Sequence, residues 1–396
     1  MQLRALTLAI AALTSAATLA SLPAHAQTAT PVAATATAVT PKAVAQHYAA
    51  LVHANYADSL AAAKDMQAVI AEFVKTPTAD GLNKARKAWL DAREYYGQTE
   101  AFRFYGGPID DDNGPEGQIN AWPLDEAYVD YVEGKPKAGM VNNPKLKITK
   151  ANLIAFNERG GEENISAGWH AIEFLLWGQD LSETAPGNRP FEDYVVGKGQ
   201  NAERRAQYLT VATQLLVDDL AKVTRAWEPG KKNYRARFEQ GGRESVRKMI
   251  VGMGSLSRGE LAGERMEVAL NSQDQEDEHS CFSDNTHRDA VTNAKGIQNV
   301  WLGQYQRRDG SLLQGPGVRD LVAAKNAALA EKTTAQVAAS VKGAEAIPAP
   351  FDRAIIKGSA GRPVMEKTIA SLVEQSKLLV ESASAIGIAK LTLVEP

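Results

Sequence analysis

The spacing of apolar side chains constrains the fold of this chain more than any other feature. In residues 42–74, and again from Asp80 onward, apolar and aromatic side chains recur every three or four positions, as on one face of a helix. The clearest members are Tyr48, Val52, Tyr56, Met66, Ile70 and Phe73, then Leu82, Trp89 and Tyr96. Further helical runs lie near 166–180, 201–227, 243–272, 289–307, 317–342 and 363–386. No stretch shows sustained strand alternation, so we predict an all-α protein.

The number of long helices and the chain length both favour two helical bundles. At 396 residues the chain exceeds one ordinary hydrophobic core. We place the N-terminal bundle at 42–230 and the C-terminal bundle at 231–396. A faint internal echo suggests a duplication, because "AGWHAIEFLLWGQD" (167–180) and "AGERMEVALNSQD" (262–274) begin and end alike.

The N-terminus has the pattern of an export signal. Arg4 precedes an apolar stretch, and "AHA" ends at Ala26, which predicts a signal peptide over residues 1–26 that is cleaved after Ala26. A membrane anchor is the weaker alternative, because the stretch is short and Pro23 ends it. Residues 27–41 are rich in Ala, Thr and Pro and predict a flexible tether. We therefore expect an exported, soluble protein.

Charge and cysteine content exclude several classes of function. A formal net charge of -3 gives no global field for nucleic acid, so we expect no nucleic-acid partner. Cys281 is the only cysteine, which excludes an intramolecular disulfide, a thiolate zinc cluster and a Cys-x-x-Cys-His haem site.

One long segment interrupts the helical pattern. Residues 106–150 are rich in Gly, Pro and Asp and show no helical repeat until their end. Loops of this length in compact domains are usually functional or disordered. Trp122, Tyr128 and Tyr131 argue against disorder, so we predict an ordered insertion packed on the bundle, over a site.

His170 and Glu173 are two ionisable residues inside the apolar run "SAGWHAIEFLLWGQD". Three positions apart on a helix, they share one face, and an imidazole and a carboxylate there can reach one cation together. The alternative is a buried hydrogen bond between the two side chains. Burying an unpaired carboxylate costs several kcal/mol, so a metal ion would compensate Glu173.

Further candidates come from two other segments. Glu100 follows Trp89, Arg93 and Tyr96 along one helical stripe, as a third metal ligand or as an ion-pair partner of Arg93 and Arg103. The acidic run at 271–289 contains Glu276 and His279, at the Glu-x-x-His spacing of carboxylate-bridged iron bundles, followed by Asp284 and His287. These four residues line a site or form a solvated turn. Nitrogen and oxygen ligands without thiolate suit iron, zinc or manganese.

The sequence lacks the motifs of several enzyme classes. It contains no His-Glu-x-x-His, and Phe174 stands where the inverse motif needs its second histidine. A metallopeptidase would therefore rest on His170 and Glu173 as metal ligands. That is the alternative function we carry forward.

Gly168-Trp-His170-Ala-Ile-Glu173 matches the Gly-x-His-x-x-Glu signature of the imelysin-like proteins. The stretch ending in "GGPID" also resembles this family, and "LAGERMEVAL" through "EDEHSCFSDNTH" is similar to its iron-regulated protein A branch. The resemblance implies two four-helix bundles with a site between them, a periplasmic location and a role in iron uptake or homeostasis. The implied ligand is iron or an iron complex, and the implied partner is a membrane iron-transport system.

The resemblance also assigns residues. His170 and Glu173 fill the signature, and Glu100, Arg103 and Asp110 lie in the second matching stretch. The family was first labelled as metallopeptidases, although its architecture differs from that of other His-x-x-Glu peptidases.

Overall fold

The computed structural model describes residues 39–389 and 391–394. The predicted signal peptide, and residues 27–38 of the predicted tether, lie outside the described part. Helices dominate the remainder, and one two-stranded hairpin is the sheet found there, which confirms the prediction of an all-α fold. No helix among the described residues combines the length and apolar character needed to cross a membrane.

The first part of the chain contains two long helices, a series of short elements and a third long helix. These elements are α1 (Pro41–Lys75), α2 (Ala79–Tyr96), η1 (Gly97–Phe102), α3 (Glu116–Ile119), α4 (Glu126–Val129), η2 (Met140–Asn142), α5 (Lys150–Phe156), α6 (Gly168–Trp177), η3 (Phe191–Tyr194) and α7 (Ala202–Ala226).

The second part is again mainly helical. Its elements are α8 (Tyr234–Gln240), α9 (Arg243–Ser255), the π-helix η4 (Leu256–Glu267), α10 (Val268–Ser272), η5 (Gln275–Asp277), η6 (Cys281–Ser283), α11 (Thr286–Leu302), β1 (Gln304–Gln306), β2 (Leu312–Gln314), α12 (Val318–Ala323), α13 (Ala327–Glu345), α14 (Phe351–Ile355) and α15 (Arg362–Ala385).

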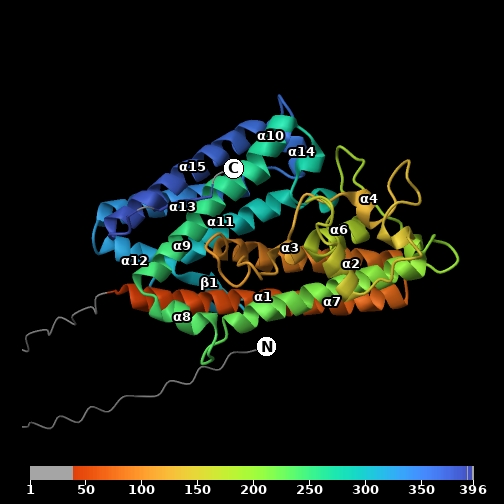
Figure 1. Cartoon of the computed structure of the whole chain (residues 1–396). Coiled ribbons are helices and arrows are strands. Elements are labelled where there is room, and N and C mark those ends of the chain that lie inside the picture. The colour runs from red at the N-terminus through yellow and green to blue at the C-terminus, as the bar shows by residue number, and fades with distance from the viewer. Residues whose placement is uncertain (1–38, 390, 395–396) are drawn as a thin grey trace, which may run out of the picture. The chain divides into compact units, whose positions relative to one another are not determined.

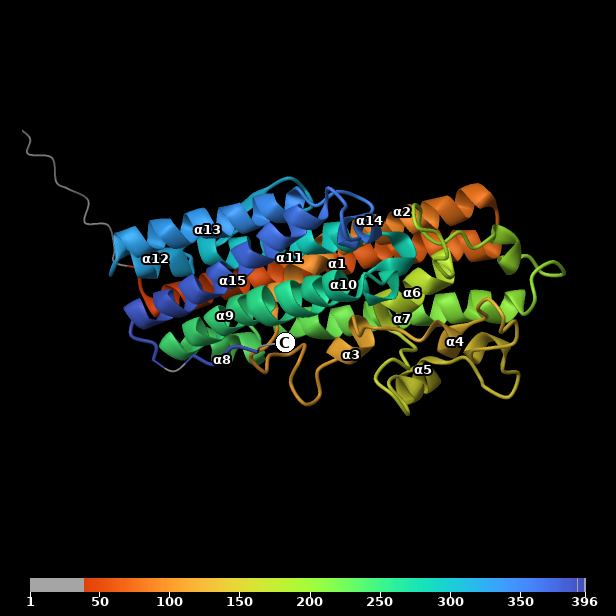
Figure 2. The same cartoon turned by 90° about the horizontal axis from the view of Figure 1, so that it is seen from above.

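Two sets of long helices pack around a shared core. In the first set α1 packs against α2 and α7, and in the second α15 packs against α13, α9 and η4 (Figures 1 and 2). Helix α11 contacts both sets, through α13 on one side and through η1 and α2 on the other. The buried apolar side chains form one continuous cluster from Val44 to Ile388. The division into two bundles at residue 230 stays a prediction.

Three helical segments differ from their predicted extent. The run at 289–307 ends at Leu302, because Gly303 adopts a left-handed conformation with φ 66°, and β1 then pairs antiparallel with β2. The run at 317–342 is divided, because the Asn326 side chain caps a new helix by accepting from the Leu329 amide. Within 243–272 the twelve residues Leu256–Glu267 form the π-helix η4.

The segment at 106–150 folds into short elements that pack on α6 and α7. Ile109, Ile119 and Val141 are buried in the main core. Asp130, which is fully buried, pairs with Arg189 at 2.9 Å and with Arg205 of α7 at 2.6 Å. These ion pairs anchor the segment at Asp130, and α3 lies against α6.

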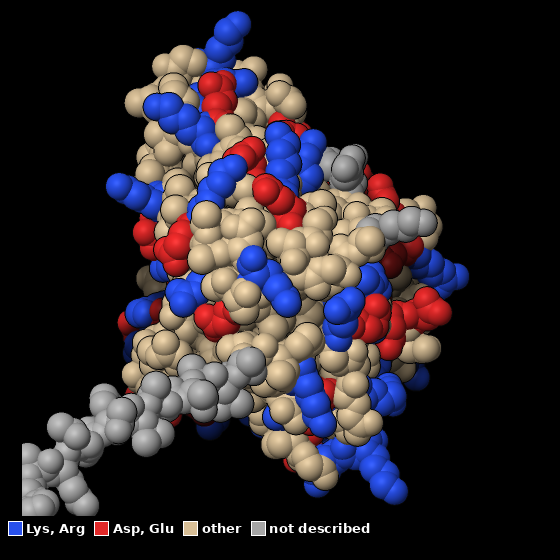
Figure 3. All heavy atoms as spheres, turned by 90° about the vertical axis from the view of Figure 1, so that its left-hand side faces the viewer, with Lys and Arg blue, Asp and Glu red and all other residues tan. Residues whose placement is uncertain are grey.

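Figure 3 shows one face of the molecule, on which basic and acidic side chains are interspersed. This mixed distribution agrees with the small net charge.

Candidate functional site

Helix α6 carries the His-x-x-Glu pair and is buried along its whole length. Gly168 opens the helix with φ +83°, and a Cβ there would lie 2.5 Å from the Ile119 carbonyl oxygen and 2.7 Å from that of Gln118. Only glycine therefore lets α3 approach this close to the start of α6. This contact brings the 106–150 segment beside His170.

His170 and Glu173 form the hydrogen bond that the sequence left open as one of two interpretations. His170 Nδ1 lies 2.8 Å from Glu173 Oε2. The other oxygen, Oε1, accepts from the amide and hydroxyl of Ser283, at 3.0 and 2.6 Å. Both carboxylate oxygens are thus occupied, and His170 Nε2 is buried without a hydrogen-bond partner.

A second histidine is held in the same manner. His279 Nδ1 lies 2.8 Å from Asp289 Oδ2, in the first turn of α11. The two imidazole rings meet edge to face, with centroids 4.7 Å apart and an interplanar angle of 72°. Each ring is therefore oriented by a carboxylate that contacts its Nδ1 atom. A carboxylate is the usual partner of a metal-binding histidine, and Nε2 of each ring is the nitrogen that can make another contact. Asn120 Nδ2 lies 3.5 Å from His279 Nε2.

Arg93 connects this pair to the aromatic core. Its guanidinium donates to Asp289 Oδ1 at 2.9 Å and to Asn120 Oδ1 at 2.6 Å. It also lies over the rings of Trp89, Tyr96 and Trp169, at 5.4 to 5.7 Å from their centroids. The apolar rings desolvate the guanidinium, so its pairing with Asp289 is stronger than a surface ion pair.

Glu100 lies in η1 and is buried close enough to His279 for the two charges to act on each other. Its Oε2 accepts from Arg103 at 2.8 Å and from Arg265 of η4 at 2.7 Å, and Oε1 has no hydrogen-bond partner. Arg103 also pairs with Glu116 at 3.1 Å, and Arg265 with Glu260 at 2.7 Å. Three carboxylates thus share two guanidinium groups, which leaves an excess of negative charge. The two arginines overcome burial and lower the Glu100 pKa to about 2.

Burial decides the charge of the two histidines. It lowers the pKa of His279 to about 4, with Arg265 acting in the same direction. It also lowers the pKa of His170 well below its usual value, helped by His279 and Arg93. Burial raises the pKa of Glu173 to about 8, against the Ser283 hydrogen bond. Both imidazoles are therefore neutral at pH 7 and can act as nitrogen donors.

The donor set partly fits a metal ion. His170 Nε2 and Glu100 Oε1 are buried atoms without hydrogen bonds, and both are atoms that metals use as ligands. The hydroxyls of Tyr56 and Tyr96 are also unpartnered, and Glu100 is the charge that acts on each most strongly. However, no group of three or more His, Cys, Asp or Glu side chains in the described ranges is already arranged to hold a metal ion. The two histidines are the part of such a site that is already oriented.

The remaining predicted residues lie at different places. Arg103 pairs with Glu100, as the alternative interpretation of that stripe proposed, whereas Arg93 pairs with Asp289 instead. Asp110 accepts from the amides of Phe104 and Gly107 and shapes the loop after η1. Glu276 is exposed, and the half-buried His287 contacts the Asp284 carbonyl through Nδ1 at 3.0 Å.

The sequence patterns did not identify several residues that contact the predicted site residues. Asp289 and Arg265, which fix His279 and Glu100, were not assigned roles, and neither were Asn120 and Ser283. The internal echo carried a signal for one of them: with the two Ala-Gly pairs aligned, Arg265 occupies the position of His170. Both residues reach the same buried region.

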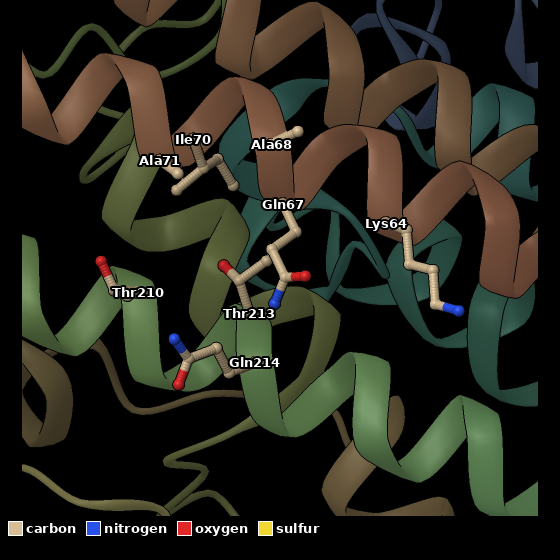
Figure 4. A pocket seen from close by; sticks show the side chains of 8 residues that line it. All are labelled: Lys64, Gln67, Ala68, Ile70, Ala71, Thr210, Thr213 and Gln214. Carbon is tan, nitrogen blue, oxygen red and sulfur yellow. The ribbon is translucent and has the colours of Figure 1, made fainter.

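The hollow in Figure 4 is separate from this region. It lies between α1 and α7, has a volume of about 330 Å³, and is lined by residues such as Lys64, Gln67 and Thr213. None of its lining residues is a His, Asp or Glu, so it offers no metal-ligand chemistry.

Fold and site together define an all-α protein with two carboxylate-oriented histidines buried between two sets of helices. The imelysin family model matches residues 52–379, well over half of the chain, and the chain belongs to this family. Iron-regulated protein A from Synechococcus elongatus is 27% identical over 299 residues, which span 75% of this chain and 73% of the relative.

A solved structure also shares the fold. A chain from Parabacteroides distasonis, described as an iron-regulated protein A precursor, matches with a TM-score of 0.68 and 16% sequence identity. The match covers 88% of this chain and 97% of that chain.

Proposed function

We propose that this protein binds iron at the buried pair His170 and His279, and that it serves iron uptake or homeostasis in the periplasm. The observation that carries the proposal is the geometry of the two rings. They come from separate segments, lie 4.7 Å apart and are each oriented through Nδ1 by a carboxylate. The family and the name of the Synechococcus relative support iron as the cargo.

The electrostatics of the region favour a cation. Glu100, Glu116 and Glu260 carry one more carboxylate than Arg103 and Arg265 can neutralise. Two neutral imidazoles add donors without adding positive charge. In this arrangement Glu173 and Asp289 orient the rings through Nδ1, and Glu100 adds negative charge to the same region.

A metal titration tests this proposal. Wild-type protein should bind about one equivalent of iron, with zinc and manganese as competitors. The variants His170→Ala and His279→Ala should each lose it, and His53→Ala, which removes a half-buried imidazole from α1, should bind like wild type. Affinity should fall as the pH falls, because a ligand imidazole must donate Nδ1–H to an ionised Glu173. Equal binding by all four proteins would overturn the proposal.

A metallopeptidase would need a metal-bound water and a nearby general base. Glu173, the carboxylate beside His170, is already hydrogen-bonded through both oxygens, which favours a carrier over an enzyme. Peptide turnover by the iron- or zinc-loaded protein, abolished by a chelator, would instead support the peptidase.

A further inference from the structure

A cleft of about 520 Å³ lies where the β1–β2 hairpin meets α2, η1 and α11. The hairpin is the sheet found in the described part of this helical chain, and β1 contacts α1 and α11 (Figure 1). Small-molecule sites usually have volumes of about 300–1,000 Å³, so the cleft has the size of such a site. Five of the ten residues that line it carry a primary amide, namely Gln98, Gln298, Asn299, Gln304 and Gln306.

The charged residues of the cleft are already paired. Glu94 accepts two hydrogen bonds from Arg288, each at 2.7 Å. Arg307 makes the same two-fold contact with Asp58, again at 2.7 Å for each bond. Lys295 pairs at 3.1 Å with the glutamate that ends α13. Each charge therefore has an opposite charge beside it, which favours a neutral ligand over a metal ion or an anion.

Two of the amides are held in place before any ligand arrives. Gln98 Nε2 donates to the Glu94 carbonyl at 2.8 Å, and Gln98 Oε1 accepts from Asn299 Nδ2 at 2.9 Å. Asn299 is 9% exposed, and its Oδ1 has no hydrogen-bond partner within the described residues. This oxygen is a fixed acceptor in the wall of the cleft. Gln298 and Gln304 are half-buried in the same wall and add amides that both donate and accept.

Apolar surface is present beside the amides. Leu312 of β2 is 53% exposed and Tyr95 of α2 is half-buried, and both line the cleft. A second cavity of about 420 Å³ shares Glu94 and Tyr95 with it, so a ligand longer than one ring has room to extend along α2. The cleft thus combines paired charges, several amides and a small apolar area.

We propose that this cleft binds a neutral saccharide of one or two rings. A sugar ring carries hydroxyls around its rim and C–H groups on its faces. One planar amide offers a donor and an acceptor side by side, so it can engage two neighbouring hydroxyls. The C–H faces can pack on Tyr95 and Leu312. A short peptide fits less well, because the cleft has no unpaired charge for its two charged termini.

The cleft is separate from the histidine pair. His170 and His279 contact Glu173, Asp289 and Asn120, and none of these five residues lines the cleft. The proposal therefore does not rest on iron binding, and either one can fail without the other.

Isothermal titration calorimetry with four saccharides tests the proposal. The probes are glucose, maltose, N-acetylglucosamine and N,N′-diacetylchitobiose, and the N-acetylated pair distinguishes a cell-wall fragment from a free sugar. At least one probe should bind wild type with a Kd of about 0.1–1 mM. Gln298→Ala and Gln304→Ala should each weaken that binding about fivefold to tenfold, because each removes one amide from the cleft.

Matched controls keep the result specific to the cleft. Gln67→Ala removes a half-buried amide from the separate hollow between α1 and α7, and it should bind the saccharide like wild type. His170→Ala should also bind like wild type. If no probe binds at about 10 mM, or if Gln298→Ala and Gln304→Ala bind like Gln67→Ala, the proposal is wrong. Tighter binding of the peptide N-acetyl-dialanine amide than of any saccharide would also overturn it.

Discussion

Buried carboxylates are paired with arginines on one side of the Glu278–His279 dipeptide and are unpaired on the other. On the histidine side, Asp289 is paired with Arg93, and Glu100 is paired with Arg103 and Arg265. On the other side, Glu278 is 1% exposed and has no Lys, Arg or His partner among the described residues. The paired side keeps its imidazoles neutral and oriented before any ligand arrives. On the unpaired side, burial raises the pKa of Glu278 well above its usual value, so its carboxyl group favours the protonated form.

The largest effect is expected from breaking the paired side. Arg93→Ala leaves Asp289 buried without its guanidinium and removes the cation that lies over three aromatic rings. The free energy of unfolding should fall by about 3–5 kcal/mol, as measured by urea denaturation. Lys87→Ala on the same helix breaks an exposed pair with Asp91 and should cost less than about 1 kcal/mol. Equal losses in the two variants would contradict the contrast.

The close approach at Gly168 should give the next largest effect. Gly168→Ala places a Cβ against the Ile119 carbonyl oxygen, whereas Gly197 has the same φ of +83° and open space around it. Gly168→Ala should therefore destabilise the protein by about 1–3 kcal/mol more than Gly197→Ala does. Because the 106–150 segment would be displaced from His170, it should also weaken iron binding. If Gly197→Ala loses as much stability as Gly168→Ala, the positive φ alone explains the effect.

The smallest effect expected is on the pH dependence of stability, through Asp284. Asp284 has a pKa of about 7 in the folded protein, above its usual value of 3.8, so the folded state holds more protons than the unfolded state between these values. Its contribution to stability is thus present at low pH and lost as the pH rises through about 7. Asp284→Asn should show a weaker decline in unfolding free energy from pH 5 to 7.5 than wild type. Asp91→Asn is the control, and an unchanged decline in Asp284→Asn would contradict the raised pKa of Asp284.

The apolar spacing predicted the helices. It missed features that depend on one residue, or on contacts between residues far apart in the sequence. The run predicted at 201–227 is α7 at 202–226, because its apolar face repeats without interruption. The run at 289–307 was predicted too long, because the left-handed Gly303 ends α11 before the apolar spacing fades. The π-helix η4 has no counterpart in the apolar spacing.

The same distinction holds for the site. His170 and Glu173 were found because three residues on one helix set their contact locally. Arg93 and Asp289 are separated by 196 positions, and their pairing depends on how α2 packs against α11. A single sequence gives no measure of that packing, so the spacing of the acidic run at 271–289 favoured Glu276 beside His279, whereas Asp289 is the carboxylate that contacts this ring.

Anomalous diffraction at the iron edge from iron-soaked crystals tests the central claim most directly. We predict one strong peak within bonding distance of Nε2 of both His170 and His279, with Glu173 and Asp289 still hydrogen-bonded to Nδ1. A peak that contacts neither imidazole, or the same peak retained in crystals of His170→Ala, would contradict it.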